Sequence, residues 1–125
     1  MDDDEVILLM VQGLLQRHGL EVAAFRNPRD ALAAVKARSD QFDVVVTDHD
    51  MPGMSGLDLA REVARIRPDL PILLSSGWVS DELRSEARAV GVREVFCKED
   101  SYRDLGESVL RLLAAAEKSR ISPGR

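Results

Sequence analysis

The 125-residue chain has a single cysteine and no long apolar or basic run, and each shortage excludes something. Cys97 has no partner for an internal disulfide, which suits a reducing compartment, and we expect a small buried apolar side chain there. No stretch is long enough to cross a bilayer, and the acidic residues 1–5 are unlike a basic signal-peptide leader. The net charge is −5, without a basic block for nucleic acid or anionic lipid. We therefore expect a cytoplasmic protein with no nucleic-acid or membrane partner.

The length and composition fit one ordinary globular domain. A chain of 125 residues can bury a core without disulfides, and 45% apolar with 31% charged residues is a common balance. The Ser-Pro-Gly at the end breaks the helical pattern before it. We expect one domain at residues 1–118 and a disordered tail at 119–125.

Short apolar runs alternate with stretches of helical periodicity. Apolar spacing predicts helices with inward-facing stripes, the first of them made by Val6, Leu9, Met10, Leu14 and Leu15. The alternation predicts an α/β doubly wound parallel sheet. The helices are expected at residues 6–18, from 28 onward, 57–66, 81–90 and 102–116, and the strands at 20–25, 44–47, 72–75 and 92–97.

Polar residues follow three of the expected strands: Asp48, Ser76 and Lys98. Taken singly, each has a plainer interpretation as a turn residue or a solvated charge. In an open parallel sheet, however, ligands collect beyond the carboxyl ends of the strands. A carboxylate, a hydroxyl and an ammonium delivered to one edge therefore favour a functional site.

An acidic cluster, Asp2-Asp3-Asp4, precedes the first helix. It could cap that helix, or an acid pair beside Asp48 could hold Mg²⁺, which prefers oxygen ligands. A carboxylate at Asp48 could attack phosphorus, with Mg²⁺ and Lys98 offsetting the negative charge. The Ser76 hydroxyl could then donate a hydrogen bond to a phosphoryl oxygen.

The segment Thr-Asp-His-Asp-Met-Pro-Gly-Met-Ser-Gly at residues 47–56 resembles the phosphorylation loop of response-regulator receiver domains. The resemblance continues through residues 71–78 and 91–98, and the local sequence there is most similar to receivers of hybrid sensor kinases. It implies a signalling domain rather than an enzyme, with a histidine kinase or phosphotransfer protein as partner. By this resemblance the roles are the phosphoacceptor Asp48, the switch hydroxyl Ser76, the phosphate-contacting Lys98 and the Mg²⁺ ligands Asp2, Asp3 and Asp48.

The family's usual fold is a flavodoxin-like parallel sheet of five strands in the order 2-1-3-4-5. In this chain only Met1 precedes the acid pair, so the usual first strand is missing at the N-terminus. The gap could close directly, pair with another chain, or be filled by residues 6–11 as a strand. Because Ile7, Leu8 and Val11 add apolar surface, we expect the segment to stay helical and the protein to form a homodimer.

Three smaller departures concern the last strands. Glu99 follows Lys98 where relatives usually have proline, so we expect a trans peptide bond there. Val95 stands where strongly switching relatives often have an aromatic residue, which excludes an aromatic rotamer switch. Phe96 and Trp78 are expected to be packing residues.

Two other functions stay open. A degenerate receiver could act unphosphorylated as a protein-binding or dimerisation module, because no strand anchors Asp2 and Asp3. Asp48-His49-Asp50 also resembles the motif of haloacid-dehalogenase-type phosphatases, in which Asp48 would be the nucleophile and Asp50 the general acid. The position of the acid pair at the start of the chain argues against that enzyme.

Overall fold

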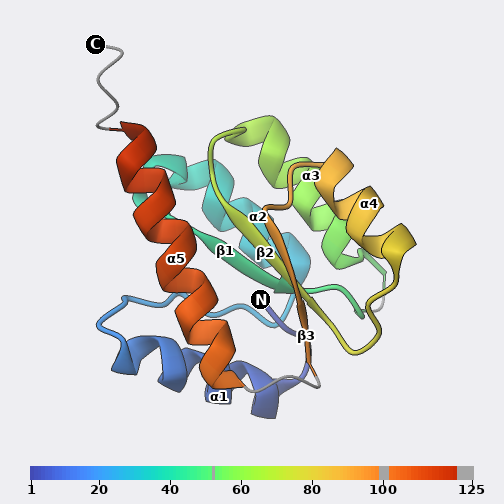
Figure 1. Ribbon diagram of the computed structural model, residues 1–125, viewed down its shortest axis with the longest axis horizontal. Coiled ribbons are helices and arrows are strands. Elements are labelled where there is room, and N and C mark those ends of the chain that lie inside the picture. The colour runs from blue at the N-terminus through green and yellow to red at the C-terminus, as the bar shows by residue number, and fades with distance from the viewer. Residues whose placement is uncertain (52, 99–101, 121–125) are drawn as a thin grey trace.

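The computed structural model describes residues 1–51, 53–98 and 102–120, and these ranges contain five α-helices and three strands (Figure 1). The side chains of residues 39, 102, 103 and 116–120 lie outside this description. The elements are α1 (Glu5–Arg17), α2 (Pro28–Ala37), the short 3₁₀ helix η1 (Ser39–Gln41), β1 (Val45–Asp48), α3 (Gly56–Ile66), β2 (Ile72–Ser76), α4 (Asp81–Ala89), β3 (Glu94–Cys97) and α5 (Tyr102–Arg120).

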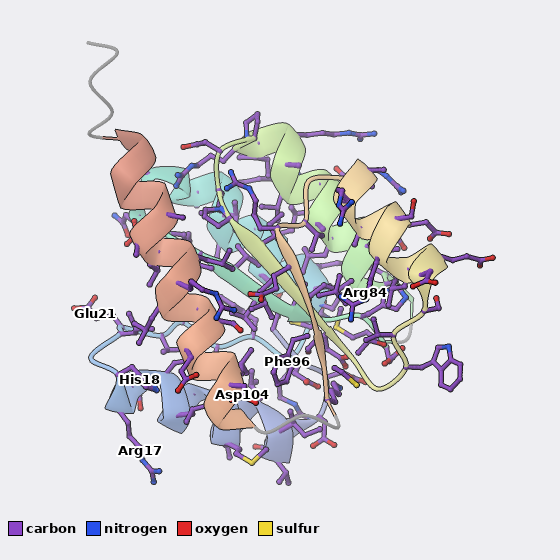
Figure 2. All side chains as sticks on the ribbon, viewed as in Figure 1. Arg17, His18, Glu21, Arg84, Phe96 and Asp104 are labelled. Carbon is purple, nitrogen blue, oxygen red and sulfur yellow. The ribbon has the colours of Figure 1, made fainter. Side chains whose placement is uncertain are left out.

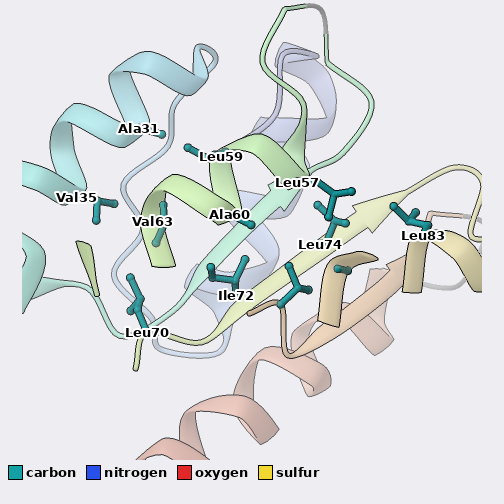
Figure 3. Packing of buried hydrophobic residues seen from close by; sticks show 12 residues of the cluster. Ala31, Val35, Leu57, Leu59, Ala60, Val63, Leu70, Ile72, Leu74 and Leu83 are labelled. Atoms are coloured by element: carbon teal, nitrogen blue, oxygen red, sulfur yellow. The ribbon is translucent and has the colours of Figure 1, made fainter. Parts of the chain in front are cut away.

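The three strands form a parallel sheet in the order β1-β2-β3. The apolar runs predict the parallel sheet, and the order matches the 3-4-5 part of the order that the resemblance implies. The central strand β2 is buried along its whole length. Its alternating side chains serve two cores, because successive residues of a strand point to opposite faces. Ile72 and Leu74 pack with α2, α3 and α4, whereas Leu73 packs with α1 and α5. Figure 3 shows the first of these cores, and the arrangement confirms the doubly wound α/β class.

Residues 20–25 do not form the strand that their sequence predicts. The segment has a high strand propensity, but a strand exists only where a neighbour completes its hydrogen bonds. Only a short piece of chain lies beside it: the Asp2 N–H donates to the Phe25 carbonyl at 3.2 Å. The missing first strand therefore removes a second strand from the described sheet as well.

Between residues 20–25 and β1, the expected position of the first strand, Met1 and Asp2 form a short bridge near the carboxyl end of β1. The amino group of Met1 donates to the Val46 carbonyl at 2.6 Å, and the Asp48 N–H donates to the Met1 carbonyl at 2.9 Å. With the bond from Asp2 to Phe25, these contacts tie the two residues to both sides of the gap. Figure 1 shows the N-terminus in the middle of the molecule. The gap is not closed directly.

Helix α1 stays helical, which confirms one part of the expectation for residues 6–11. The predicted inward stripe was wrong in its first half: Val6 is 74% exposed and Leu9 60%, and Met10 is also exposed. Leu15 is buried as predicted, and Leu8, seven residues before it, is buried in place of Leu9, because the helix turns this side toward the sheet and α5. Homodimer formation stays a prediction.

The predictions for residues near the last strands have mixed outcomes. Phe96 is buried between the sheet and α5, as expected (Figure 2). Trp78 is 81% exposed, so the expectation that it packs was wrong, because it lies in the loop beyond the end of β2. Cys97 is half-buried. The peptide bond between Lys98 and Glu99 lies outside the described residues.

Helix α5 runs to Arg120, beyond the end predicted at residue 116, and residues 121–125 lie outside the described residues. The domain boundary at 118 stays a prediction. Among the described helices, none has both the length and the apolar character that a membrane span requires.

Candidate functional site

Asp48 ends β1 at the carboxyl edge of the sheet, and it is only 2% exposed. Its register partner on β2 is Ser75, so the carboxylate lies beside the end of the central strand. The N–H of Asp50 donates to Asp48 Oδ1 at 3.1 Å. The loop after β1 thus folds back onto the carboxylate that the sequence singled out.

Lys98 follows β3 and reaches across the sheet to Asp48. Its own N–H donates to the Ser76 carbonyl at 2.8 Å, which fixes where the residue leaves the sheet. Lys98 Nζ lies 2.9 Å from Asp48 Oδ1 and 3.7 Å from Asp2 Oδ2. The ammonium group therefore lies between two carboxylates at a largely buried position, where an ion pair is screened less than at the surface.

The three aspartates of the acidic cluster at the start of the chain make different contacts. The Asp4 side chain accepts hydrogen bonds from the N–H groups of Val6 and Ile7, so it is the N-cap of α1. Asp2 and Asp3 turn toward Asp48, and one carboxylate oxygen from each of the three residues lies within 4.8 Å of the others. The capping interpretation is thus confirmed for Asp4, and the Mg²⁺ interpretation of Asp2 and Asp3 stays a prediction.

These three carboxylates fit a divalent cation of the Mg²⁺ type. They supply hard oxygen ligands at one point, and two of them, Asp2 and Asp48, are buried. Burial raises the pKa of Asp2 above its ordinary value of 3.8, against the hydrogen bond from the Asp4 N–H, and the nearby Asp48 charge raises it further. A buried carboxylate destabilised in this way gains from a cation beside it.

The amino group of Met1 borders the same site. Desolvation by burial lowers the pKa of this group from 8.0 to about 6, although the charges of Asp2 and Asp48 oppose the change. The sequence motifs do not indicate that this amino group lies beside the site. Its hydrogen bond to Val46 holds the chain just before the acid pair.

Ser76 lies at the same edge of the sheet, but its hydroxyl contacts Asp50 and the Trp78 carbonyl rather than Asp48. Its Oγ lies 3.1 Å from Asp50 Oδ2 and 2.9 Å from the Trp78 carbonyl, and the single hydroxyl proton can serve one of them at a time. The Gly77 N–H also donates to Asp50 Oδ2, at 3.2 Å. Asp50 therefore orients the end of β2, a role that the sequence patterns miss.

Gly56, the first residue of α3, lets the start of that helix pack closely against the backbone of Asp48 and His49, where any side chain would clash. A Cβ added there would lie 2.5 Å from the Asp48 carbonyl oxygen and 2.7 Å from His49 Cα. Ser55 before it forms a capping box with Asp58, because each side chain accepts the other residue's N–H. The loop after Asp48 is thereby tied at both ends, and the glycine in the sequence motif is the signal for it.

The site thus lies where the carboxyl ends of parallel strands meet, the usual ligand edge of a doubly wound α/β protein. The family model described as "Response regulator receiver domain" matches residues 1–110. The chain belongs to that family, whose members are receivers of two-component signalling.

The relatives agree. The chain is 31% identical over 115 residues to the response regulator receiver protein CpdR of Brucella abortus, an alignment that covers 92% of this chain and 93% of that protein. It is 32% identical over 121 residues to the C4-dicarboxylate transport transcriptional regulatory protein DctD of Rhizobium meliloti, and this match covers 97% of the chain but 25% of DctD. The chain therefore spans only a quarter of this longer relative.

Among solved structures, a CheY-like response regulator receiver domain protein from Methanospirillum hungatei superimposes with a TM-score of 0.86 at 26% identity. The match covers 94% of this chain and 93% of that one. The flavodoxin-like fold is therefore kept although the described sheet has three strands.

Proposed function

We propose that the protein is a phosphoacceptor: Asp48 takes a phosphoryl group, with Mg²⁺, from a histidine kinase or phosphotransfer protein. The observation that carries this proposal is the buried Asp48 carboxylate at 2.9 Å from the Lys98 ammonium and within 4.8 Å of two further carboxylates. We assign this function to a single domain at residues 1–118 and to the cytoplasm.

The transfer step follows from these groups. An Asp48 carboxylate oxygen forms a bond to phosphorus while the bond from phosphorus to the donor's histidine nitrogen breaks. The leaving nitrogen keeps the electron pair and takes a proton from solvent. Lys98 stabilises the negative charge on the transferred oxygens. Asp2, Asp3 and Asp48 would hold Mg²⁺, which supplies further positive charge at the same point.

Ser76 is the proposed switch hydroxyl. To donate to a phosphoryl oxygen on Asp48 it must give up its contacts with the Trp78 carbonyl and with Asp50. Those contacts fix the turn at residues 76–78, so phosphorylation would rearrange a surface loop. A protein partner would read this change.

The alternative is a degenerate receiver that binds a protein or dimerises without phosphorylation. One observation favours it: among the described residues, the backbone of Asp2 is anchored by the short Met1–Asp2 bridge rather than by a full strand. Loose anchoring weakens a metal site. The phosphatase is disfavoured, because Asp50 accepts from Gly77 and contacts Ser76 instead of standing free to act as an acid beside Asp48.

The test is intact-mass measurement after incubation with a small-molecule phosphodonor such as acetyl phosphate. The expected result is a gain of one phosphoryl group that requires Mg²⁺ and is absent from Asp48→Asn. Asp40→Asn is the matched control, because it removes an exposed carboxylate of η1 away from the site.

The other outcomes separate the candidates. Failure of the wild type to gain mass with Mg²⁺ present supports the degenerate module. Consumption of the donor without an adduct on Asp48 supports the phosphatase.

A further inference from the structure

The loops that follow β1 and β2 meet at the carboxyl edge of the sheet (Figure 1), and the side chain of Asp50 joins them. Asp50 Oδ2 lies 3.1 Å from Ser76 Oγ and accepts the Gly77 N–H at 3.2 Å. The Ser76 hydroxyl in turn accepts the Trp78 N–H at 3.3 Å. We call the two contacts of Asp50 Oδ2, with Ser76 and with Gly77, the Asp50 latch.

The Asp50 latch holds a buried hydroxyl by means of an exposed carboxylate. Ser76 ends β2 and is 1% exposed, whereas Asp50 is exposed in the loop after β1. A serine hydroxyl has one proton to donate. While Ser76 donates this proton to Asp50 or to the Trp78 carbonyl, it has none to offer to a group on Asp48.

The backbone of Asp50 connects the latch to Asp48. The Asp50 N–H donates to Asp48 Oδ1 at 3.1 Å, so the two carboxylates belong to one short turn. A phosphoryl group would change the charge on the Asp48 side chain from −1 to about −2. Because like charges this close repel, the added charge weakens the hold of Asp50 on Ser76. The hydroxyl can then donate to a phosphoryl oxygen.

We propose that Asp50 is a positioning residue, whose carboxylate holds Ser76 away from Asp48 in the unphosphorylated protein and releases it when Asp48 gains charge. This inference rests on the proposed function, since it assigns the control of the switch hydroxyl. A neutral side chain that accepts the same hydrogen bonds would hold Ser76 without being repelled. Phosphorylation is thereby coupled to the turn at residues 76–78 through repulsion at Asp50 as well as attraction at Asp48.

Two variants of Asp50 separate the hydrogen bonds of the latch from its charge. Asp50→Ala removes both, whereas Asp50→Asn removes the charge and keeps a carbonyl oxygen that can accept from Ser76 and Gly77. The control is Asp40→Asn, which changes an exposed carboxylate of η1 away from the site. All measurements use the full chain.

The first arm of the test measures the latch by NMR of isotope-labelled protein, without phosphodonor or Mg²⁺. A hydrogen bond to a carboxylate moves an amide proton downfield, so the Gly77 amide should lie downfield in the wild type and move upfield in Asp50→Ala. Asp50→Asn should keep most of the downfield position, and Asp40→Asn all of it. The signal is assigned by its loss in Gly77→Ala, where the added Cβ would meet nothing within 4 Å.

The second arm adds acetyl phosphate and Mg²⁺ and follows the rate of phosphoryl gain by intact mass. Removal of one negative charge affects Asp50→Ala and Asp50→Asn alike, whereas only Asp50→Ala also frees Ser76. We therefore expect Asp50→Ala to react roughly threefold to tenfold faster than Asp50→Asn, and the two to react equally once Ser76→Ala is added. On phosphorylation the Gly77 signal should move upfield in the wild type and stay in place in Asp50→Asn.

Each arm can overturn the proposal. An unmoved Gly77 amide in Asp50→Ala, equal rates of the two Asp50 variants, or a rate difference that persists with Ser76→Ala contradicts the latch. A Gly77 signal that stays in place when the wild type is phosphorylated contradicts its release by charge. A wild type that gains no phosphoryl group overturns the proposed function and the release step with it, whereas the first arm then still decides whether Asp50 holds Ser76.

Discussion

At the scale of single residues, Asp2 is a carboxylate that the folded protein holds in an unfavourable place. We predict that Asp2→Asn stabilises the metal-free protein, because burial and then the nearby Asp48 charge disfavour the Asp2 carboxylate in the folded state. The raised pKa of Asp2 sets the sign, because the fold disfavours the charged form. Urea unfolding at neutral pH measures the difference.

The same variant should lose the stabilisation that Mg²⁺ gives the wild type, because it removes a ligand. Lowering the pH toward 3.8 should remove the metal-free difference, since a protonated aspartic acid resembles asparagine. A variant that keeps the full Mg²⁺ effect would show that Asp2 is not a ligand. Asp40→Asn serves as the control.

The Met1 amino group predicts a second pH dependence. Its pKa is lowered from 8.0 to about 6, so the folded state releases this proton and stability is lost as the pH falls from 8 to 6. The loss is roughly 2–3 kcal/mol for a shift of this size. Unfolding curves across this range should show it for the free amino terminus and not for Nα-acetylated protein. Equal slopes for the two forms contradict the prediction.

Much of the candidate site could be predicted at the residue scale. Asp48 and Lys98 converge because the carboxyl ends of parallel strands share an edge, a rule that needs only the strand positions. Asp2 and Asp3 follow no strand, and their place beside Asp48 was expected from the resemblance to receiver domains. Ser76 was found as a member, but its orientation depends on the conformation of the loops after two strands. The Met1 amino group could not be foreseen, because its place follows from how the fold fills a gap.

At the scale of elements, the capping box formed by Ser55 and Asp58 fixes the start of α3, where the loop after Asp48 ends. We predict that Ser55→Ala lowers the free energy of unfolding by about 1 kcal/mol, since it removes the acceptor for the Asp58 N–H. Ser85→Ala in the exposed middle of α4 is the matched control and should change stability little or favourably. Chemical denaturation of the two variants tests the difference, and equal losses would assign no role to the box.

The elements show where sequence patterns fail. Helices were predicted within a few residues, because periodicity and capping are local properties. Residues 20–25 have the composition of a strand, yet strand formation depends on a neighbour that is distant in sequence or missing. In α1 apolar residues lie on several sides, so the pattern does not fix which side turns inward, and Leu8 is buried where Leu9 was expected.

At the scale of the whole molecule, the expected homodimer remains to be tested. The large apolar residues that α1 leaves exposed are Val6, Leu9 and Met10. Of the predicted Ile7, Leu8 and Val11, Leu8 is buried and the other two are half-buried. We predict a concentration-dependent dimer in sedimentation velocity experiments, and Leu9→Lys should shift it to monomer while leaving the circular dichroism spectrum unchanged. A wild-type monomer at the highest accessible concentration contradicts the prediction.

The exposed Trp78 gives the molecule a natural optical reporter. It is the sole tryptophan of the sequence, and its indole is 81% exposed while its backbone carbonyl is held by Ser76. An indole in water emits at long wavelength, so any rearrangement of the 76–78 turn that covers the ring moves the emission maximum to the blue. The rates at which the proposed phosphoryl group is gained and lost would therefore be followed in the unlabelled protein by its own fluorescence.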